Sequence, residues 1–352
     1  MTTAGQGGDE APELSVVIPA YGGDAMLARC LEHVAAALAR RPELTAEVVV
    51  RDDASPSGLG AELIAAHPDV RFLTGEVNLG FSGNTNAAVR ASRGGLLCLL
   101  NTDMYVAPDF FAGCLEPFAA EPALFARCAC IAEPSGNNDG VKVLRLGPDG
   151  VEQRSFPVDA PESARPAAVP YANGGGAFFR RAMFEALGGF DEVFSPYYWE
   201  DTDLGYRAWK RGLTIVYDPA LRLEHDHQST IGREKKKRVK AIFKRNRTLF
   251  LWRNYTDMGL PALVLRTHIG PALKALLRLR LGKMAGLLQE LRLLPAARRA
   301  RAIEAPHRRR TDAELAAIWA AEGPERVGLS EAPDGARDEA TDGGTETQRE
   351  RA

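Results

Sequence analysis

The sequence from residue 95 to residue 103 reads Gly-Leu-Leu-Cys-Leu-Leu-Asn-Thr-Asp, an apolar run that ends in three polar residues. A short, fully apolar run bounded by turn-forming residues predicts a strand that is buried on both faces, as in a parallel sheet. Ligands of open α/β sheets bind beyond the carboxyl ends of the strands, which places Asn101 and Asp103 at such an edge. Their oxygen atoms could hold a divalent cation against a diphosphate there, or they could simply cap a turn.

Three further strands are predicted before this run, and helical patterns separate them. Apolar or β-branched runs predict strands at 14–19, 47–51 and 70–73. Amphipathic patterns predict helices at 24–38, 58–66 and 84–92. Strands that alternate with helices at this spacing indicate an α/β fold, with a Rossmann-like, mostly parallel sheet that is flanked by helices and joined by right-handed crossovers.

The second half of the chain carries a weaker signal at first. Residues 126–171 show only short patterns among prolines and glycines, and no element is predicted there. After them the sequence predicts a glycine-rich turn and strand at 173–179, helices at 181–187 and 201–211, and a strand at 214–217.

Composition divides the chain into four parts. The polar stretches 1–13 and 322–352 lack apolar periodicity, which predicts disordered tails, the second of them acidic. Between them we expect a catalytic α/β domain at 14–232 and a basic α-helical region at 233–321.

Charge is distributed unevenly along the 352 residues, whose formal net charge is only -2. Between Arg233 and Arg310 there are 22 Lys or Arg residues against four acidic ones, which indicates contact with something anionic. No apolar run reaches the roughly 18 residues of a membrane span, and the N-terminus lacks a signal-peptide core. Five cysteines at irregular spacings indicate neither a disulfide framework nor a zinc site. A cytoplasmic protein with reduced cysteines is therefore expected.

Two candidate nucleotide-binding segments follow the early strands. Asp52 closes the second strand, where its carboxylate could accept a hydrogen bond from a nucleobase or a ribose; a solvated turn is the alternative. Residues 78–86 combine two glycines with three asparagines ahead of a helix, which suits close approach to a nucleotide but also an ordinary capped loop. The Gly-x-Gly-x-x-Gly fingerprint is missing after the first strand, which disfavours NAD chemistry.

Acidic and aromatic residues lie together further along. Glu200 and Asp201 follow Tyr197-Tyr198-Trp199 and begin a helix, so their carboxylates would lie at a positive helix end beside aromatic rings. Acids in the first turn of a helix are routine, but these aromatic neighbours suit a sugar-binding pocket that contains a base. His225 could supply a nitrogen ligand to a Mn²⁺ or Mg²⁺ ion.

Taken together, seven motifs resemble the family 2 glycosyltransferases with the GT-A fold, especially rhamnosyltransferase-like members. In the family's order they are Val16-Val17-Ile18-Pro19-Ala20-Tyr21, Asp52-Asp53-Ala54-Ser55, Asn78-Leu79-Gly80-Phe81, Leu100-Asn101-Thr102-Asp103, Gly188-Gly189-Phe190-Asp191, Trp199-Glu200-Asp201 and His225. Asn101 replaces the first acid of the family's Asp-x-Asp motif, which leaves Asp103 as the main metal ligand.

The resemblance implies a role for each segment. It implies that Asp201, with Glu200 beside it, is the catalytic base, and that Asp103 and His225 bind a divalent metal ion, Mn²⁺ or Mg²⁺. It also implies that Asp52 contacts the nucleobase. An acceptor and sugar pocket would include Gly175, Gly176 and Trp199. The implied nucleotide-sugar site comprises Pro19, Ala20, Tyr21, Asp52, Asn78, Gly80, Phe81, Asn84, Asn101, Thr102 and Asp103.

The activity expected from this resemblance is inverting transfer of one sugar, rhamnose or another hexose, from a dTDP- or UDP-linked donor. The acceptor would be a cell-envelope polysaccharide or a lipid-linked glycan. A nucleotidyltransferase is one alternative, but Tyr21-Gly22-Gly23-Asp24 does not supply the basic glycine-rich loop that it needs. A catalytically inactive sugar-binding or scaffold protein is the other, and intact Asp103, Asp201 and His225 argue against it.

The basic helical region has the composition of an interfacial helix, with leucines and basic residues at helical intervals. It predicts peripheral contact with an anionic membrane at the inner face of the plasma membrane. Helices that pack their apolar side on the catalytic domain are the alternative, and we expect them in the first part of the region. Nucleic acid is not an expected partner, because no aromatic-stacking or helix-turn-helix signature is present.

Overall fold

The computed structural model describes residues 11–132, 137–147, 150–157, 166–226, 236–257, 259–277 and 290–322. The predicted tails 1–13 and 322–352 lie outside these ranges, except for residues 11–13 and for Glu322, the last residue of a helix. The start of the predicted basic region at 233–235 and its stretch 278–289 also lie outside the described residues.

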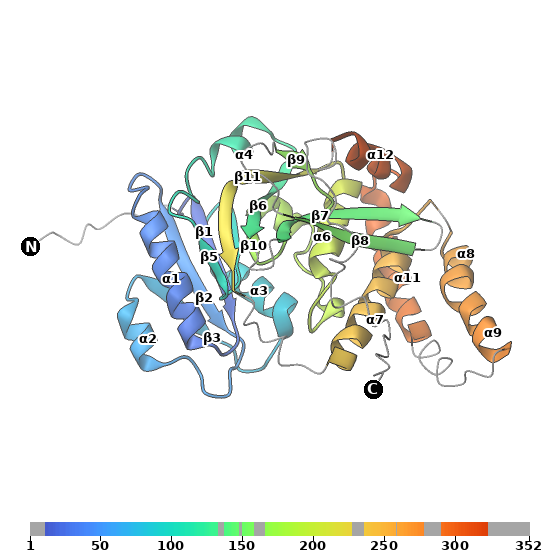
Figure 1. Ribbon diagram of the computed structural model, residues 1–352, viewed down its shortest axis with the longest axis horizontal. Helices are drawn as coiled ribbons and strands as arrows, with labels where there is room; N and C mark the ends of the chain where they lie inside the picture. Colours follow the sequence, from blue (N-terminus) through green and yellow to red (C-terminus); the bar gives the residue numbers. More distant parts are fainter. Residues whose placement is uncertain are drawn as a thin grey trace, which may run out of the picture.

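The first half of the chain folds as the predicted alternation of strands and helices (Figure 1). Strand β1 pairs in parallel with β2 and with β4, and β2 pairs in parallel with β3. The elements are β1 (Leu14–Ala20), α1 (Asp24–Leu38), β2 (Ala46–Asp52), α2 (Ala61–Ala66), β3 (Val70–Thr74), α3 (Gly80–Ala91) and β4 (Leu96–Leu100).

Two of the predicted helix starts are wrong. Helix α2 begins at Ala61 instead of residue 58, because Gly58 with a φ of 65° and Gly60 form the turn before it. Helix α3 begins at Gly80 instead of Asn84, although Ser82, Gly83 and Asn84 have low helix propensity. These residues are buried, and burial in tertiary contacts overrides intrinsic propensity here.

The remaining elements extend the sheet in the order β3-β2-β1-β4-β10-β6-β11-β5. Strand β10 is antiparallel to β4 and β6, and β11 runs parallel to β6, so the sheet is mixed with mostly parallel strands on its N-terminal side. The elements are β5 (Met104–Val106), α4 (Glu116–Ala120), β6 (Leu124–Ala132), β7 (Asn137–Gly147), β8 (Gly150–Pro157), β9 (Ala167–Ala168), β10 (Gly176–Arg180), α5 (Arg181–Ala186), the 3₁₀ turn η1 (Glu192–Phe194), α6 (Glu200–Lys210) and β11 (Thr214–His225).

Strand β11 is much longer than the predicted 214–217. Its pairing with β6 shifts register between Asp218 and Arg222, around Pro219, and then continues to Glu224, while the strand itself ends at His225. Proline is tolerated at such an irregularity because no ladder hydrogen bond is required of it there. The irregular stretch therefore hid the end of the strand, which carries His225 to the ligand edge of the sheet.

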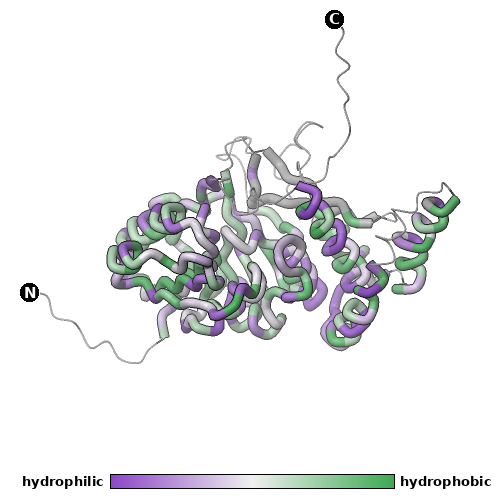
Figure 2. The backbone as a smooth tube through the Cα atoms, turned by 90° about the horizontal axis from the view of Figure 1, so that it is seen from below, coloured by the Kyte–Doolittle hydropathy of each residue, from purple (hydrophilic) through white to green (hydrophobic). Residues whose placement is uncertain are grey.

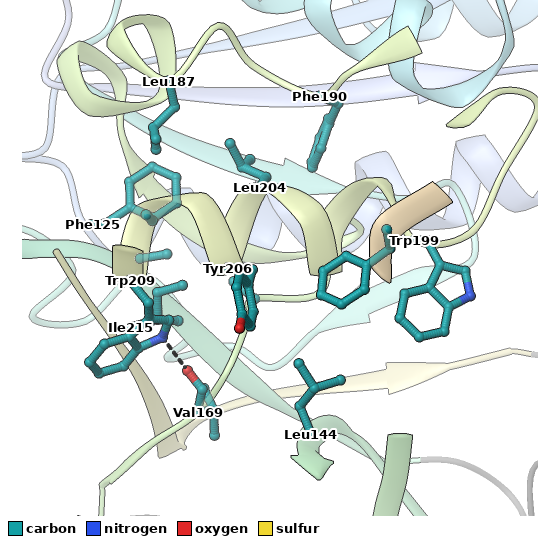
Figure 3. Packing of buried hydrophobic residues seen from close by; sticks show 14 of the residues in the cluster. Phe125, Leu144, Val169, Leu187, Phe190, Trp199, Leu204, Tyr206, Trp209 and Ile215 are labelled. Atoms are coloured by element: carbon teal, nitrogen blue, oxygen red, sulfur yellow. Dashed lines mark hydrogen bonds between the residues drawn. The ribbon is translucent and has the colours of Figure 1, made fainter. Parts of the chain in front are cut away.

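Apolar side chains fill both faces of the sheet. Helix α1 covers one face together with the segment that contains Phe110 and Phe111. Helices α3, α5 and α6 and the C-terminal helices cover the other face. Figure 3 shows how α6 is packed there, with Trp209 donating a hydrogen bond from Nε1 to the carbonyl oxygen of Val169 at 2.9 Å. This packing fixes the helix at whose start Glu200 and Asp201 lie.

The C-terminal helices are α7 (Lys236–Asn254), α8 (Leu260–Val264), a π turn (Leu265–Ile269), α9 (Gly270–Leu277), α11 (Leu294–Glu304) and α12 (Asp312–Glu322), with 3₁₀ turns at Leu291–Leu293 and Ala305–His307. Helices α7, α11 and α12 contribute Trp252, Ala297 and Trp319 to the same core as α6. The predicted packing of the first part of the basic region on the domain is thus confirmed. No helix among the described residues is long and apolar enough to cross a membrane.

All five cysteines are buried and free of disulfide bonds, as predicted. Burial raises the pKa of the Cys30 thiol to about 12 and that of Cys114 to about 11, so both stay protonated near neutral pH. They serve as small apolar residues of the core.

Candidate active site

Ser55, in the loop after β2, connects the ends of β1 and β2 by hydrogen bonds. Ser55 donates a hydrogen bond from its hydroxyl to Asp52 and accepts one from the backbone amide of Gly22 at 2.7 Å. Asp52 also accepts a bond from the Ser55 amide at 3.1 Å and has no exposed surface. In the structure Asp52 therefore fixes the turn after Tyr21, which is itself exposed. A contact between Asp52 and a nucleobase would require Ser55 to give up its bond, and it stays a prediction.

The neighbouring carboxylate holds the next predicted segment. Asp53 accepts hydrogen bonds from the backbone amides of Leu79 and Gly80 at 2.9 and 2.8 Å, which satisfies two free donors at the start of α3. Burial raises the pKa of the Asp53 carboxyl, although both amides and the Arg51 guanidinium oppose that rise. Sequence reasoning quoted Asp53 only as part of a motif and missed this role.

Asn84, predicted as the first residue of a helix, lies inside α3, which begins at Gly80. Its side-chain amide donates to the carbonyl oxygens of Arg51 at 3.0 Å and Ala20 at 3.4 Å, and its oxygen accepts a bond from the Arg51 guanidinium. These contacts tie α3 to the ends of β1 and β2. Asn84 thus supports the nucleotide-side edge from within, while Asn78 stays exposed at the surface.

Phe81 connects this segment with the aromatic one. Its amide donates to the carbonyl oxygen of Pro196 at 3.3 Å, and its ring lies 5.7 Å from that of Phe190. A side chain at Gly174 would come within 3.2 Å of both rings, so the two segments approach through a glycine.

The polar residues after β4 contact the glycine run before β10. The Asn101 amide donates to the carbonyl oxygen of Gly175 at 3.0 Å, and Gly176 pairs with Leu100. A Cβ atom at Gly175 would lie 2.3 Å from the side-chain nitrogen of Asn101, so only glycine fits there. The structure thus brings the predicted pocket residues Gly175 and Gly176 against the predicted donor site at Asn101. Thr102 and Asn101 are both half-buried.

Asp103 and His225 meet at this edge because β5 pairs antiparallel with the end of β11. Atom Nε2 of His225 lies 3.4 Å from Oδ2 of Asp103, and both side chains are mostly buried. The Asp226 amide donates to the Asp103 carbonyl oxygen at 3.0 Å, which holds the two chain segments together. Arg29 lies nearby, 3.5 Å from Asp226 and stacked on Tyr105.

This pair fits a divalent cation in part. One carboxylate and one imidazole are donors that Mn²⁺ accepts, and their proximity lets both face one ion. The described residues contain no group of three or more His, Cys, Asp or Glu that could hold a metal. Diphosphate oxygens of a nucleotide would have to complete the coordination.

Trp199, Glu200 and Asp201 form the turn into α6. Tyr198 and Trp199 have φ angles of 73° and 76°, a conformation that is unfavourable for residues other than glycine. Trp199 is buried between the rings of Phe243 and Phe250 of α7, at centroid distances of 5.4 and 5.1 Å. Its indole therefore belongs to the core, which is not the pocket-lining position that we expected for it.

The two carboxylates of this turn differ in environment. Asp201 is half-buried, and its Oδ1 accepts hydrogen bonds from the amide of Thr202 at 2.6 Å and from its hydroxyl at 3.2 Å. Glu200 is buried, and its Oε2 has no hydrogen-bond partner among the described residues. Burial raises the pKa of the Glu200 carboxyl well above its ordinary value, and the nearby charges of Asp201 and Asp203 add to the effect. Of the two, Asp201 is the carboxylate whose side chain is partly accessible to solvent.

Asn246, which was not among the predicted site residues, holds this turn in place, and Asn86 holds the nearby Phe190. Asn246 of α7 is fully buried, and its side-chain amide donates to the carbonyl oxygens of Phe194, Tyr197 and Tyr198 at 2.6, 3.0 and 2.9 Å. Asn86 of α3 exchanges two hydrogen bonds with the backbone of Phe190, at 2.7 and 3.0 Å. A lone asparagine in a helical pattern carries no local signal for such long-range contacts.

The Gly188–Asp191 motif is anchored by charge. Arg207 donates to the carbonyl oxygens of Leu187 and Gly189, and it pairs with buried Asp203 at 2.7 Å. Arg253 of α7 bonds both Asp203 and Asp191. Burial would raise the pKa of the Asp191 carboxyl, but Arg253 and the Val193 amide outweigh it and hold that pKa below its ordinary value. The motif thus joins α6 to α7 beside the candidate base.

Comparison with known proteins identifies a family. Residues 15–188 match the family described as Glycosyl transferase family 2. An N-acetylglucosaminyl-diphospho-decaprenol L-rhamnosyltransferase of Mycobacterium tuberculosis is 26% identical over 273 residues, 68% of this chain and 88% of that protein. The succinoglycan biosynthesis protein ExoO of Rhizobium meliloti is 36% identical over 120 residues, 34% of this chain and 33% of that protein.

Solved structures share the fold. The crystal structure of GalNAc-T7 with UDP, GalNAc and Mn²⁺ has a TM-score of 0.57 at 18% identity, over 76% of this chain. This chain spans 52% of that one, about half its length. The crystal structure of S. aureus TarS 1–349 with UDP has a TM-score of 0.50 at 14% identity, over 84% of this chain and 88% of that one.

The sheet, its ordered motifs and these relatives agree with one another. The predicted GT-A architecture is confirmed, and the nucleotidyltransferase and inactive-scaffold alternatives lose their support. Residues 15–188 are a glycosyl transferase family 2 domain, and the chain is a glycosyltransferase with the GT-A fold that is similar to a mycobacterial rhamnosyltransferase.

Proposed function

We propose that this glycosyltransferase is inverting and metal-dependent, and that it moves one hexose, rhamnose in the first instance, from a dTDP- or UDP-linked donor. The observation that carries the proposal is the Asp103–His225 pair at the edge where β4 ends, from which a series of contacts leads toward the turn that carries Asp201. Gly175 contacts Asn101, two residues before Asp103, and Phe81 links Pro196 to the glycine run. These contacts lead from the candidate donor site toward Pro196, which precedes the turn that carries the candidate base.

The donor would lie along the ends of β1, β2 and β4. Tyr21 is exposed there and could cover a base or ribose, while Asn78 and the amides near Gly80 follow along the edge. Asp103 and His225 would hold a divalent cation beside the donor diphosphate. When bound, that cation would neutralise negative charge on the departing nucleotide. Two separate UDP-bound neighbours of the same fold motivate a pyrimidine nucleotide.

Asp201 would take the proton from the attacking acceptor hydroxyl. The two bonds that Oδ1 accepts from Thr202 orient the Asp201 carboxylate for this task. Protonated Glu200 beside it avoids a second negative charge at the start of α6. Attack from the side of Asp201, opposite the leaving diphosphate, inverts the configuration at the anomeric carbon.

The acceptor would be a cell-envelope polysaccharide or a lipid-linked glycan. The mycobacterial relative carries a diphospho-decaprenol acceptor in its name, and ExoO is a polysaccharide biosynthesis protein. Such an acceptor would place the enzyme in the cytoplasm, at the inner face of the plasma membrane.

A panel of nucleotide-sugars tests the proposal. Purified protein is incubated with dTDP-, UDP- and GDP-linked sugars and Mn²⁺ or Mg²⁺, and released nucleotide is measured with and without a lipid-linked acceptor. We expect turnover with a pyrimidine donor, and we expect Asp201→Asn to lower transfer by about 10² to 10⁴-fold while donor affinity is kept. Asp69→Asn, at an exposed carboxylate on the surface, is the control. Crippled Glu200→Gln beside active Asp201→Asn would reverse the assignment of the base, and turnover with GDP-sugars alone would overturn the donor class.

A further inference from the structure

One helical segment carries an apolar face that no described residue covers. It runs from Leu260 to Leu277 through α8, the π turn and α9. The side chains of Leu265, Ile269, Leu273, Leu276 and Leu277 are between 43% and 83% exposed. The first four recur every three or four residues, which is the spacing of one helix face, and Leu277 follows directly after them.

The opposite face of the same segment is docked on the domain. Leu263, Val264 and His268 are buried, and the His268 ring lies 4.7 Å from that of Trp252. The Thr267 hydroxyl accepts a hydrogen bond from Trp252 Nε1 at 3.0 Å. The segment is therefore held firmly by α7, and its outward direction is set by that contact.

Its position leaves the outward face open. Figure 1 shows α8 and α9 at the edge of the molecule, on the far side of α7 and α11 from the sheet, and Figure 2 shows the same segment at the end of the molecule, mostly green with purple residues between. An exposed apolar strip of five large side chains is unusual for a soluble surface and marks an interaction site.

Charge selects the occupant. The sequence from residue 258 to residue 289 has five Lys or Arg residues and no Asp or Glu. Among the described ones, Arg266 and Lys274 are exposed beside the apolar strip. Leucines for insertion flanked by cations only are the composition that binds an anionic lipid surface. A second copy of the chain would present the same positive charges and be repelled.

We propose that the outward face of α8–α9 is a docking surface for an anionic membrane. The apolar strip would enter the boundary between headgroups and acyl chains, and Arg266 and Lys274 would face the lipid phosphates. This inference rests on the proposed function in one respect only, namely that membrane docking would give the enzyme access to a lipid-linked acceptor. Binding to lipid needs neither donor nor Asp201.

Vesicle co-sedimentation of the full chain tests the proposal. The variants are the triple Ile269→Gln/Leu273→Gln/Leu277→Gln and the single Leu277→Gln, whose side chain is 83% exposed and does not contribute to the core. Ile64→Gln is the matched control, since Ile64 is an exposed apolar residue on α2 at the other end of the molecule. Deletion of the whole basic region is unsuitable as a test, because its Arg301, on α11, donates hydrogen bonds to the carbonyl oxygens of Trp252 and Tyr255.

We expect wild type and Ile64→Gln to bind phosphatidylcholine vesicles that contain phosphatidylglycerol, and to leave them at high salt. The partition coefficient of the triple variant into the vesicles should be about tenfold or more lower than that of wild type, and that of Leu277→Gln should be lowered by a smaller factor. Donor hydrolysis in solution should be unchanged in all four proteins. An Asp201→Asn protein that binds vesicles normally would separate this proposal from the assignment of the base.

Three results would overturn the proposal. The first is equal vesicle binding by wild type and the triple variant. The second is a wild-type dimer in sedimentation velocity that the triple variant abolishes, since a second copy would then cover the strip. The third is a lower melting temperature of Leu277→Gln without any change in vesicle binding, which would show that the chain itself covers the face.

Discussion

Atom Nε2 of His225 lies 3.4 Å from Oδ2 of Asp103, although His225 ends β11 and Asp103 lies just before β5, which runs antiparallel to β11. Neither strand alone makes a metal site. The contact arises because β11 continues past its irregularity at Pro219 and reaches the edge at which β4 ends.

This pair predicts how metal binding divides between two side chains. Asp103→Ala should abolish Mn²⁺ binding in the presence of UDP, since it removes the only carboxylate of the pair. His225→Gln should weaken that binding about tenfold to a hundredfold, the usual effect of changing a supporting ligand. Titration of Mn²⁺ followed by electron paramagnetic resonance measures both without relying on activity. His67→Gln, at a half-buried histidine near α2, is the control, and full turnover in excess chelator would contradict the metal requirement.

Buried Glu200 predicts a pH dependence of stability. Because its pKa in the folded state is raised, the folded protein holds a proton that the unfolded chain releases near pH 4.5. Stability from this group is thus fully present below that pH and is lost as pH rises toward the raised folded pKa. Glu200→Gln, which is always neutral, should remove this loss, so its melting temperature should fall less than that of wild type as pH rises above about 4.5. If the melting temperatures of both proteins fell equally as pH rises over that range, the assignment of this pH dependence to Glu200 would be contradicted.

Gly175 predicts a steric effect on the donor site. A Cβ atom there would lie 2.3 Å from the side-chain nitrogen of Asn101, so Gly175→Ala must displace Asn101 or its own strand. We expect a fall in kcat/KM of about tenfold or more, because small misplacements at an active site are costly. Gly95→Ala is the control, since its nearest contact would be an ordinary 3.9 Å from the Glu13 carbonyl oxygen. The double variant Gly175→Ala/Asn101→Gly, which frees the space, should recover part of the loss if the clash is its cause.

The sequence predicted the sheet and the order of the motifs because both are written locally. Apolar runs define the strands, and in a parallel sheet their polar ends must meet at one edge. The same local signals failed where distant contacts decide the structure. Ser82 and Gly83 are helical because they are buried, and Trp199 lies in the core because α7 offers Phe243 and Phe250.

The supporting residues of the site could not be predicted for a related reason. Asp53, Asn86 and Asn246 bond backbone groups 26 to 104 positions away, and no spacing rule connects such pairs. Their roles become visible only when the chain is folded. Of the three, Asn246 can be tested most directly by a single substitution.

Asn246 predicts that α7 maintains the turn that carries the candidate base. Its amide satisfies three carbonyl oxygens around Tyr198 and Trp199, where the backbone adopts positive φ angles. The amide has only two N–H donors, which the three acceptors share, so Asn246→Ala would remove two hydrogen bonds at about 1 kcal/mol each and should lower the free energy of unfolding by about 2 kcal/mol. Relaxation of the turn should also move Asp201, so transfer should fall more than donor affinity does. Lys240→Ala, on the exposed side of the same helix, is the control for helix propensity. Urea denaturation measures the loss of stability. Steady-state kinetics at a temperature where the variant remains folded measures the loss of transfer. An unchanged kcat in a destabilised Asn246→Ala would show that the turn holds Asp201 without help from α7.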